Sequence, residues 1–210
     1  GKHPQRQKMA MPKILITSIL LSVHVNAFTC PDYEDIRQPS VDASVFDIAD
    51  FAGTWYMIAT NEPTLPSFCT CGVNTVDVHV SEGWYSYINT DTCLDSANIS
   101  VPIKGDLSTD PESPGFLMEN FGAFNHTSNN LDPNMIFNVT YNGSELDIAL
   151  TYACITNHLY SFNILSRSNH WSTDDIEDII NTANNVTNGL LKVSGMRISD
   201  EIAYEECGML

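Results

Sequence analysis

The sequence predicts an all-β fold, and three observations support this prediction. From residue 52 onward, short β-prone segments alternate with turn signals at the spacing of hairpins. One later segment changes to helical spacing. The chain has 210 residues, of which 43% are hydrophobic and 17% charged, so it can bury one sizeable core. We therefore expect eight antiparallel strands in a sandwich or an up-and-down barrel, with one helix outside.

Different signals predict the individual strands. Segment 53–60 is apolar and aromatic, whereas segment 73–80 alternates apolar and polar residues. Asn142-Gly143 is a hairpin signal between two apolar segments. The eight strands are expected at 53–60, 73–80, 84–89, 98–107, 115–121, 135–141, 146–155 and 159–166.

A single amphipathic helix is expected after the last strand. Ser172 offers an N-cap oxygen, acidic residues follow it, and Gly189 is a suitable stop. The outer wall of a barrel would supply the apolar surface that this helix needs. Its apolar face is expected to contain Ile176, Ile179, Ile180 and Ala183.

The N-terminal segment has the pattern of a secretory signal peptide. Lys13 supplies a positive charge, residues 14–25 are mostly apolar, and Val25-Asn26-Ala27 is a small-residue cleavage site. We expect three regions: a leader and signal peptide at 1–27, an N-terminal arm at 28–45, and the barrel with its C-terminal helix and tail at 46–210. No apolar run reaches the roughly 18 residues of a membrane span, so no integral membrane segment is expected.

The expected location is secreted or extracellular. The Ala27-Phe28 junction also resembles the signal-peptide end of proteins sent to secondary plastids, so a plastid or thylakoid lumen is the alternative. A transit peptide is poor in acids, but six acidic residues and one arginine follow this junction up to Asp50. Secretion is therefore preferred.

Acidic residues dominate the charge. The chain has 9 Lys and Arg against 26 Asp and Glu, a net charge of −17. Removal of residues 1–27 would leave five cations against the same 26 acids, a net charge of −21. Nucleic acid is excluded as a partner because phosphate contacts need clustered cations, and anionic lipid is disfavoured for the same reason.

Cysteines and glycosylation sequons fit an exported protein. An even number of cysteines suggests three disulfides, and arithmetic alone leaves their pairing open. Cys69-Thr70-Cys71 resembles half of a thiolate metal site, but the second half is missing, so no metal is expected. The cysteines are Cys30, Cys69, Cys71, Cys93, Cys154 and Cys207. The sequons start at Asn98, Asn125, Asn138, Asn142 and Asn185.

Three segments resemble the lipocalin family. Gly53-Thr54-Trp55-Tyr56, with its lead-in from Phe46, looks like the first lipocalin motif. Ile164-Leu165-Ser166-Arg167 resembles the last motif, and Leu150-Thr151-Tyr152-Ala153-Cys154 resembles the seventh strand of the apolipoprotein D type. The resemblance covers about residues 46–207. It implies an eight-stranded up-and-down barrel whose narrow end is closed by Arg167 stacked on Trp55, with Gly53 as part of the motif.

The same resemblance implies a disulfide pattern. It pairs Cys30 with Cys154 and joins Cys207 to a cysteine that follows the first strand. Two cysteines compete for that position. We prefer Cys71–Cys207 with Cys69–Cys93, and the exchange of Cys69 and Cys71 remains the alternative.

The resemblance implies a secreted carrier that transports or sequesters a small hydrophobic ligand in the barrel. A retinoid, carotenoid, sterol, fatty acid or bilin-like molecule would suit such a cavity, and no cofactor is expected. A cell-surface receptor is a further partner of the family, although the usual T-D-Y motif before strand seven has no clean equivalent. The candidate cavity lining is Met57, Ala59, Val76, Val78, Trp84, Ile88, Phe116, Met118, Phe137, Val139, Ile148, Leu150 and Tyr152.

Two alternative functions remain. Local segments, including Asp110-Pro111 and Cys207-Gly208, are similar to the lipocalin domain of xanthophyll de-epoxidases. In such an enzyme, a buried carboxylic acid would protonate the epoxide, and Asp132 with Tyr152 lies near the family's candidate acid and tyrosine. The second alternative is a secreted barrel that binds a protein and has a filled cavity.

Overall fold

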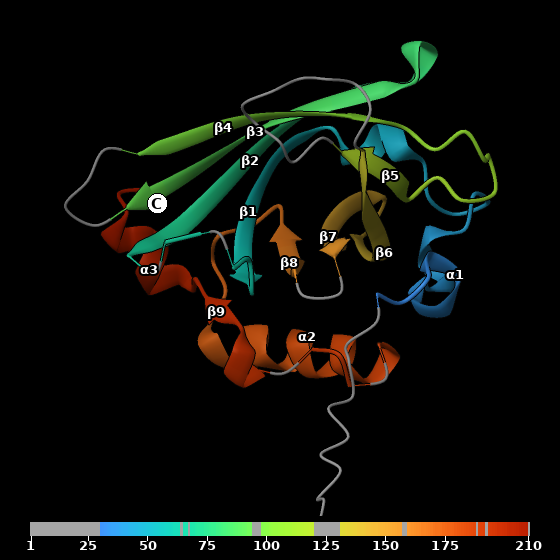
Figure 1. The fold of residues 1–210 in the computed structure, drawn as a ribbon. Helices are drawn as coiled ribbons and strands as arrows, with labels where there is room; N and C mark the ends of the chain where they lie inside the picture. The colour runs from blue at the N-terminus through green and yellow to red at the C-terminus, as the bar shows by residue number, and fades with distance from the viewer. Residues whose placement is uncertain are drawn as a thin grey trace, which may run out of the picture.

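A computed structural model shows a closed β-barrel with short helices outside it (Figure 1). It describes residues 30–63, 65–66, 68–93, 98–119, 131–156, 159–187, 189–191 and 193–209. The expected signal peptide and Asn125 lie outside these residues. The fold is the predicted all-β up-and-down barrel, and the sandwich alternative is wrong.

Eight strands form the barrel, and each pairs antiparallel with its neighbour in the sequence. Strand β1 closes the barrel because it pairs with both β2 and β8. Trp55 of β1 lies opposite Asn74 of β2, and Met57 lies opposite Leu165 of β8. The strands are β1 Gly53–Thr60, β2 Cys69–His79, β3 Trp84–Cys93, β4 Ile99–Asp106, β5 Phe116–Glu119, β6 Asp132–Asn142, β7 Glu145–Thr156 and β8 Leu159–Ser166. All eight expected segments overlap these strands.

The turn between β6 and β7 shows how local sequence sets the strand order. Asn142 pairs with Glu145, so Gly143 and Ser144 form a two-residue turn. Gly143 has a φ of +66°, a left-handed conformation that glycine adopts without steric cost. The Asn-Gly pair therefore favours this turn because Gly143 has no Cβ atom that would oppose a positive φ.

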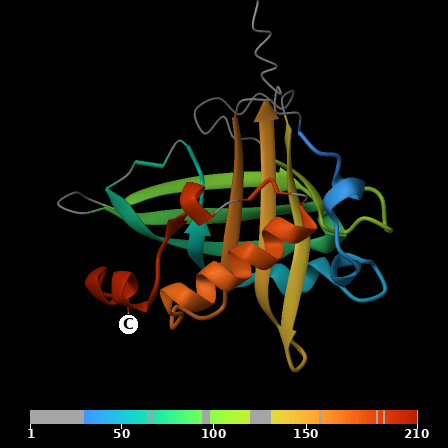
Figure 2. The same ribbon diagram turned by 90° about the horizontal axis from the view of Figure 1, so that it is seen from below.

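Helix α2, Thr173–Val186, covers one wall of the barrel. The Ser172 hydroxyl accepts a hydrogen bond from a backbone N–H of the first turn, as its N-cap position predicts. Ile176, Ile180 and Ala183 are buried in the shared core. Figure 2 shows the helix crossing the outer faces of β6, β7 and β8. The outer faces of these strands are therefore covered by the helix where it crosses them.

The N-terminal arm covers a neighbouring part of the outer wall. It contains helix α1, Tyr33–Ile36, and two short 3-10 helices, η1 Pro39–Val41 and η2 Ile48–Phe51. The buried Tyr33 hydroxyl donates a hydrogen bond to the carbonyl of Ile136 in β6, at 3.1 Å. The arm is thus part of the folded core.

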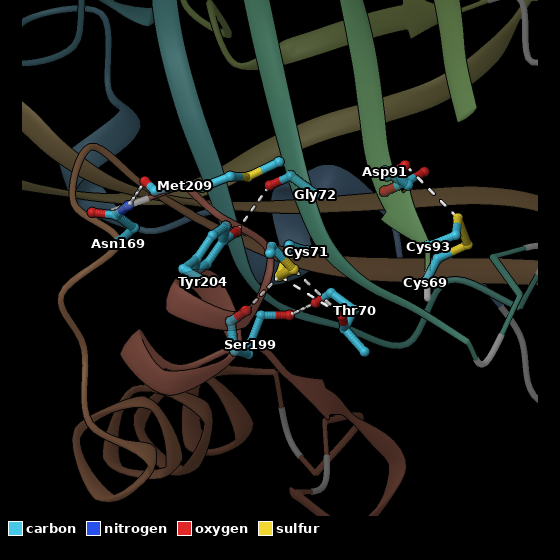
Figure 3. Close-up of a disulfide and its surroundings, with 12 residues drawn as sticks. Cys69, Thr70, Cys71, Gly72, Asp91, Cys93, Asn169, Ser199, Tyr204 and Met209 are labelled. Atoms are coloured by element: carbon cyan, nitrogen blue, oxygen red, sulfur yellow. Dashed lines mark hydrogen bonds between the residues drawn. A yellow bond between two sulfur atoms is a disulfide. The ribbon is translucent and has the colours of Figure 1, made fainter. Parts of the chain in front are cut away.

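The C-terminal segment contains elements that the sequence analysis did not predict. Strand β9, Arg197–Ile198, pairs with the end of β1, and helix α3, Glu201–Glu206, lies outside the barrel. The buried Tyr204 hydroxyl lies 2.9 Å from the carbonyl of Gly72 and donates to it (Figure 3). Both elements are too short to produce a clear periodic signal. Two further 3-10 helices are η3 Val80–Glu82 and η4 Val193–Gly195.

Three disulfides connect these parts. Cys30–Cys154 ties the arm to β7. Cys69–Cys93 links β2 to β3, and Cys71–Cys207 joins β2 to the end of α3 (Figure 3). These are the pairings preferred from the resemblance.

Candidate functional site

Arg167 and Trp55 close one end of the barrel. The guanidinium carbon of Arg167 lies 3.7 Å from the centroid of the Trp55 ring, and Trp55 is fully buried. The indole N–H of Trp55 donates to the carbonyl of Phe51 at 2.8 Å. This is the placement that the resemblance implies for the two residues. The cation–π contact therefore lies on a ring that is held in one position.

Backbone carbonyls hold the guanidinium of Arg167 in place. It donates to the carbonyls of Thr54 at 2.8 Å, Asp50 at 2.8 Å and Ala52 at 2.7 Å. Gly53 allows the close approach, because a Cβ there would lie 3.0 Å from Arg167 Nη1 and its φ is +108°. The motif glycine and the distant arginine are thus required by the same contact.

A cavity of about 480 Å³ occupies the other end of the barrel. Its apolar surface comes mainly from Met57, Leu65 and strand β4, and its polar surface from β2, β3, β6 and β8. A smaller space of about 40 Å³ shares four of its residues and reaches Phe51, next to Trp55. The lining residues of the larger cavity are Met57, Glu62, Pro63, Leu65, Pro66, Asn74, Tyr87, Asn89, Asp91, Ile99, Val101, Ile103, Asn134, Ala153, Tyr160, Ser161 and Asn163.

Glu119 of β5 is a buried carboxyl group in the smaller space. It has no exposed surface and accepts hydrogen bonds from the hydroxyls of Tyr85 and Tyr87 and from the side-chain amide of Asn134. The Asn134 bond is 2.6 Å long and the Tyr87 bond 3.1 Å. Burial raises the pKa of Glu119 to about 7, and the three hydrogen bonds partly oppose this shift. The group therefore titrates near neutral pH.

Asp91 of β3 is a second buried acid, on the wall of the larger cavity. It is 3% exposed, and its Oδ2 accepts a hydrogen bond from the Asn89 amide at 2.7 Å. Burial raises the pKa of Asp91 to about 6, although Asn89 and the charge of Arg197 lower it. The cavity thus has an acidic wall.

Four lining residues have a buried side-chain oxygen without a hydrogen-bond partner. The four atoms are the Oδ1 atoms of Asn74, Asn89, Asp91 and Asn134. All four residues belong to the larger cavity. Because buried polar atoms are normally paired, this group marks the side of the cavity where a polar ligand group would find partners.

The structure brings only part of the expected lining together. Met57 and Val76 line the cavities. On β3, β5 and β7, the expected residues occupy even-numbered positions, whereas the residues that line the cavities occupy odd-numbered positions. The inward face of these three strands is therefore the opposite of the expected one. The residues placed on that other face are Trp84, Ile88, Phe116, Met118, Ile148, Leu150 and Tyr152.

Four further expected residues lie elsewhere. Ala59 and Phe137 are buried beside bulges in β1 and β6, where the alternation of faces is interrupted. Val78 continues the face of Val76 but lies outside both cavities, and the buried Val139 also lines neither.

The outer helices explain why apolar patterning selected the opposite face. Strands β6 to β8 carry apolar residues on their outer faces because α2 covers them. Tyr152 stacks on Phe162 of β8 at 4.5 Å between ring centroids, on the face of β7 opposite to its lining residues. The inner face carries Thr151 and Ala153 instead. An apolar residue is therefore not a reliable marker of the cavity in this barrel.

Sequence analysis missed the polar residues of the cavity. A signal for them exists in β3, where Tyr85, Tyr87, Asn89 and Asp91 follow one another at every second position. Since alternate residues of a strand share a face, this pattern places a polar row on one side of the sheet. Glu119 has no such neighbours in its short strand.

The structure does not bring the candidate catalytic pair into the cavity. Asp132 begins β6 opposite Glu119, and Tyr152 lies on the face of β7 opposite to its lining residues Thr151 and Ala153. Neither residue lines the larger or the smaller cavity. The buried acids that do are Glu119 and Asp91.

Three of the four described sequon asparagines are exposed. These are Asn98, Asn142 and Asn185, while Asn138 is partly buried and accepts a hydrogen bond from Ser40 at 2.7 Å. Among the described residues, no helix is long and apolar enough to cross a membrane. In the same part of the chain, no group of three or more His, Cys, Asp or Glu residues could hold a metal ion.

Comparison with known proteins identifies the fold. The sequence matches no family model and no curated protein. Among solved structures, apocrustacyanin C2 has a TM-score of 0.56 at 16% identity and covers 82% of this chain and 88% of its own. Apocrustacyanin C1 has a TM-score of 0.53 at 18% identity, covering 78% and 86%. Lobster apocrustacyanin A1 has a TM-score of 0.50 at 17% identity, covering 72% and 77%. These similarities show that the chain has the lipocalin fold.

Proposed function

We propose that this protein binds a small, mainly apolar molecule in the larger cavity and transports or sequesters it outside the cell. The observation that carries this proposal is the cavity itself, about 480 Å³ in volume and located opposite the closed end. Ligand sites in proteins usually measure about 300–1,000 Å³. The space therefore suits one small organic molecule.

The apolar part of the cavity supports this function. Ile99, Val101 and Ile103 occupy every second position of β4 and so share its inner face. Met57 of β1 also lines the cavity. Burial of an apolar ligand against them would contribute roughly 25 cal/mol per Å² before the costs of association. These side chains suit an alkyl chain or a terpenoid skeleton.

The disulfides and the glycosylation sequons support a location outside the cell. The three disulfides connect the arm, the barrel and the C-terminal segment, and such bonds persist in oxidising compartments. Asn98, Asn142 and Asn185 are exposed, so their sequons are accessible to glycosylation. The expected signal peptide would direct the chain there.

Native mass spectrometry of protein purified from its own source tests the proposal directly, because the mass of a bound ligand would be visible. Isothermal titration of the delipidated protein with a retinoid, a carotenoid and a sterol provides a second measurement. We expect saturable binding of one molecule per chain. Absence of a bound mass together with absence of binding would favour the filled-barrel alternative.

A matched pair of variants locates the binding site. Val101→Phe adds volume inside the cavity, and we expect it to weaken binding by about tenfold or more. Ile88→Phe makes a comparable change on the outer face of the neighbouring strand, where Ile88 is 50% exposed and pairs with Pro102. The outer variant should bind as the unmodified protein does. Equal effects of both variants would contradict binding inside the barrel.

A further inference from the structure

Four acceptor atoms in the wall of the larger cavity have no hydrogen-bond donor. The Oδ1 atoms of Asn74, Asn89, Asp91 and Asn134 are buried without partners. Asn74 is 8% exposed and Asp91 is 3% exposed, so water reaches neither side chain freely. A ligand that completes this site would have to donate hydrogen bonds.

One of the asparagines, Asn89, cannot reverse this pattern by turning its amide. The Asn89 nitrogen donates to Asp91 Oδ2 at 2.7 Å, and the Asn134 nitrogen donates to Glu119 Oε1 at 2.6 Å. Rotation of the Asn89 amide would place its oxygen against the Asp91 carboxylate. The carboxyl groups thus accept from the amide nitrogens, and the amide oxygens are left without a hydrogen-bond partner.

The charges around the cavity have one sign. Asp91 lines the wall, Glu62 is also a lining residue, and Glu119 lines the adjoining smaller space. None of the described lining residues is Lys, Arg or His. Arg197 acts on Asp91 through its charge, but its guanidinium donates to the carbonyls of Leu65, Pro66 and Cys69. An anionic ligand would therefore meet repulsion without a compensating cation.

We propose that the ligand of this cavity is an amphipathic amine, whose protonated nitrogen lies against Asp91 and the asparagine oxygens while its apolar part contacts Ile99, Val101 and Ile103. This inference rests on the proposed function, because it assumes that the cavity holds a small molecule. An ammonium group carries several donors and a positive charge, which matches several acceptors beside a carboxylate. The lining rings of Tyr87 and Tyr160 can add cation–π attraction.

This assignment separates the ligand classes that the barrel fold alone allows. A fatty acid carboxylate would be repelled by Asp91 and would offer no donor to the free oxygens. A sterol or retinol hydroxyl offers one donor and no charge. The net charge of the chain, −17, further favours the approach of a cation.

A titration with octylamine, octanol and octanoate tests the proposal, because the three probes share one alkyl chain and differ in the head group. The full chain with its disulfides intact is titrated calorimetrically near neutral pH. We expect octylamine to bind about tenfold or more tightly than octanol, and octanoate to bind more weakly than both. Octanol or octanoate binding as tightly as octylamine would overturn the proposal.

A variant of Asp91 and a matched control identify the site. Asp91→Asn should reduce octylamine affinity by about tenfold and leave octanol affinity nearly unchanged. Asp77→Asn makes the same charge change on the exposed face of β2 and should alter neither. Thermal unfolding of both variants verifies that they are folded, and a folded Asp91→Asn protein with unchanged octylamine affinity would overturn the proposal.

The two proposals fail in different ways. If an apolar probe such as retinol binds but octylamine shows no advantage over octanol, the amine assignment is wrong and the carrier function stands. If neither retinol nor any of the three alkyl probes binds, the proposed function fails and the amine assignment fails with it.

Discussion

Arg167, which follows β8, lies over the ring of Trp55 in β1, with its guanidinium carbon 3.7 Å from the ring centroid. The two residues are separated by most of the barrel in sequence, so their contact forms only when β1 meets β8. Three carbonyls from the segment 50–54 hold the same guanidinium. The closed end is therefore a structural anchor at the position where the barrel closes.

Loss of the Arg167 side chain should destabilise the fold. Arg167→Ala removes the ring contact and leaves carbonyls of Asp50, Ala52 and Thr54 without their donor. We expect a loss of about 2–4 kcal/mol in the free energy of unfolding, measured by urea titration. Lys104 provides the control, because it also lies over a tryptophan, Trp84, at 4.0 Å, but is exposed. Lys104→Ala should cost about 0.5 kcal/mol, and an equal loss in both variants would contradict the anchoring role.

The stability of the protein should fall as the pH rises through neutrality. Burial raises the pKa of Glu119 from 4.5 to about 7, so the folded state holds a proton that the unfolded state has already lost. This contribution to stability is complete below about pH 4.5 and disappears as the pH rises through about 7. It amounts to about 3 kcal/mol at about 1.4 kcal/mol per pKa unit. Asp91, with its pKa raised to about 6, acts in the same direction.

The variant Glu119→Gln isolates this effect. It keeps a polar group of similar size beside Tyr85, Tyr87 and Asn134 but removes the titration. Its melting temperature should depend less on pH between about 5 and 8 than that of the unmodified protein, in a series of thermal melts. A variant whose pH profile parallels the original would show that Glu119 is not the group responsible.

The disulfides should differ in their contributions to stability. Cys71–Cys207 joins residues 136 positions apart, whereas Cys69–Cys93 joins residues 24 positions apart. A longer loop restricts the unfolded chain more, so replacing Cys71 and Cys207 by serine should cost about 1–2 kcal/mol more than replacing Cys69 and Cys93. Urea unfolding of the two double variants gives the comparison. The opposite order would show that native contacts outweigh chain entropy here.

The position of Asp132 leads to a prediction about the enzymatic alternative. Because Asp132 and Tyr152 line neither described cavity, we expect no conversion of violaxanthin in the presence of ascorbate at acidic pH. Pigment analysis by chromatography measures this outcome. Conversion that disappears in Asp132→Asn would re-establish the de-epoxidase alternative.

Most strands of the barrel could be predicted because the patterns that indicate a strand or a helix lie within short segments of the sequence. Strand β1 and strand β8 begin and end where their apolar patterns do, and helix α2 follows its N-cap at Ser172. The choice of inward face could not be predicted in the same way on β3, β5 and β7. That choice depends on register and on what covers the outer wall, and a shift of one residue exchanges the two faces.

The candidate site shows the same limit. Tyr85, Tyr87, Asn89 and Asp91 form a visible row in the sequence, but nothing in that row indicates that Asn134 and Glu119 face it. The hydrogen bonds of Glu119 cross from β5 to β3 and β6. Such contacts exist only after the strands are placed around a common axis.

The sequence by itself determined the all-β class, the positions of the eight strands and the helix, and the motif residues Gly53, Trp55 and Arg167. The strands and the helix follow from periodicity and turn residues, which are properties of short segments, and the motif residues follow from the resemblance to the lipocalin family. Only the tertiary structure decided which residues line the cavity and that its wall is acidic. The physical reason is that burial and pairing belong to the closed barrel: a carboxyl group has its raised pKa, and an amide oxygen lacks a partner, only when neighbouring strands exclude water from both.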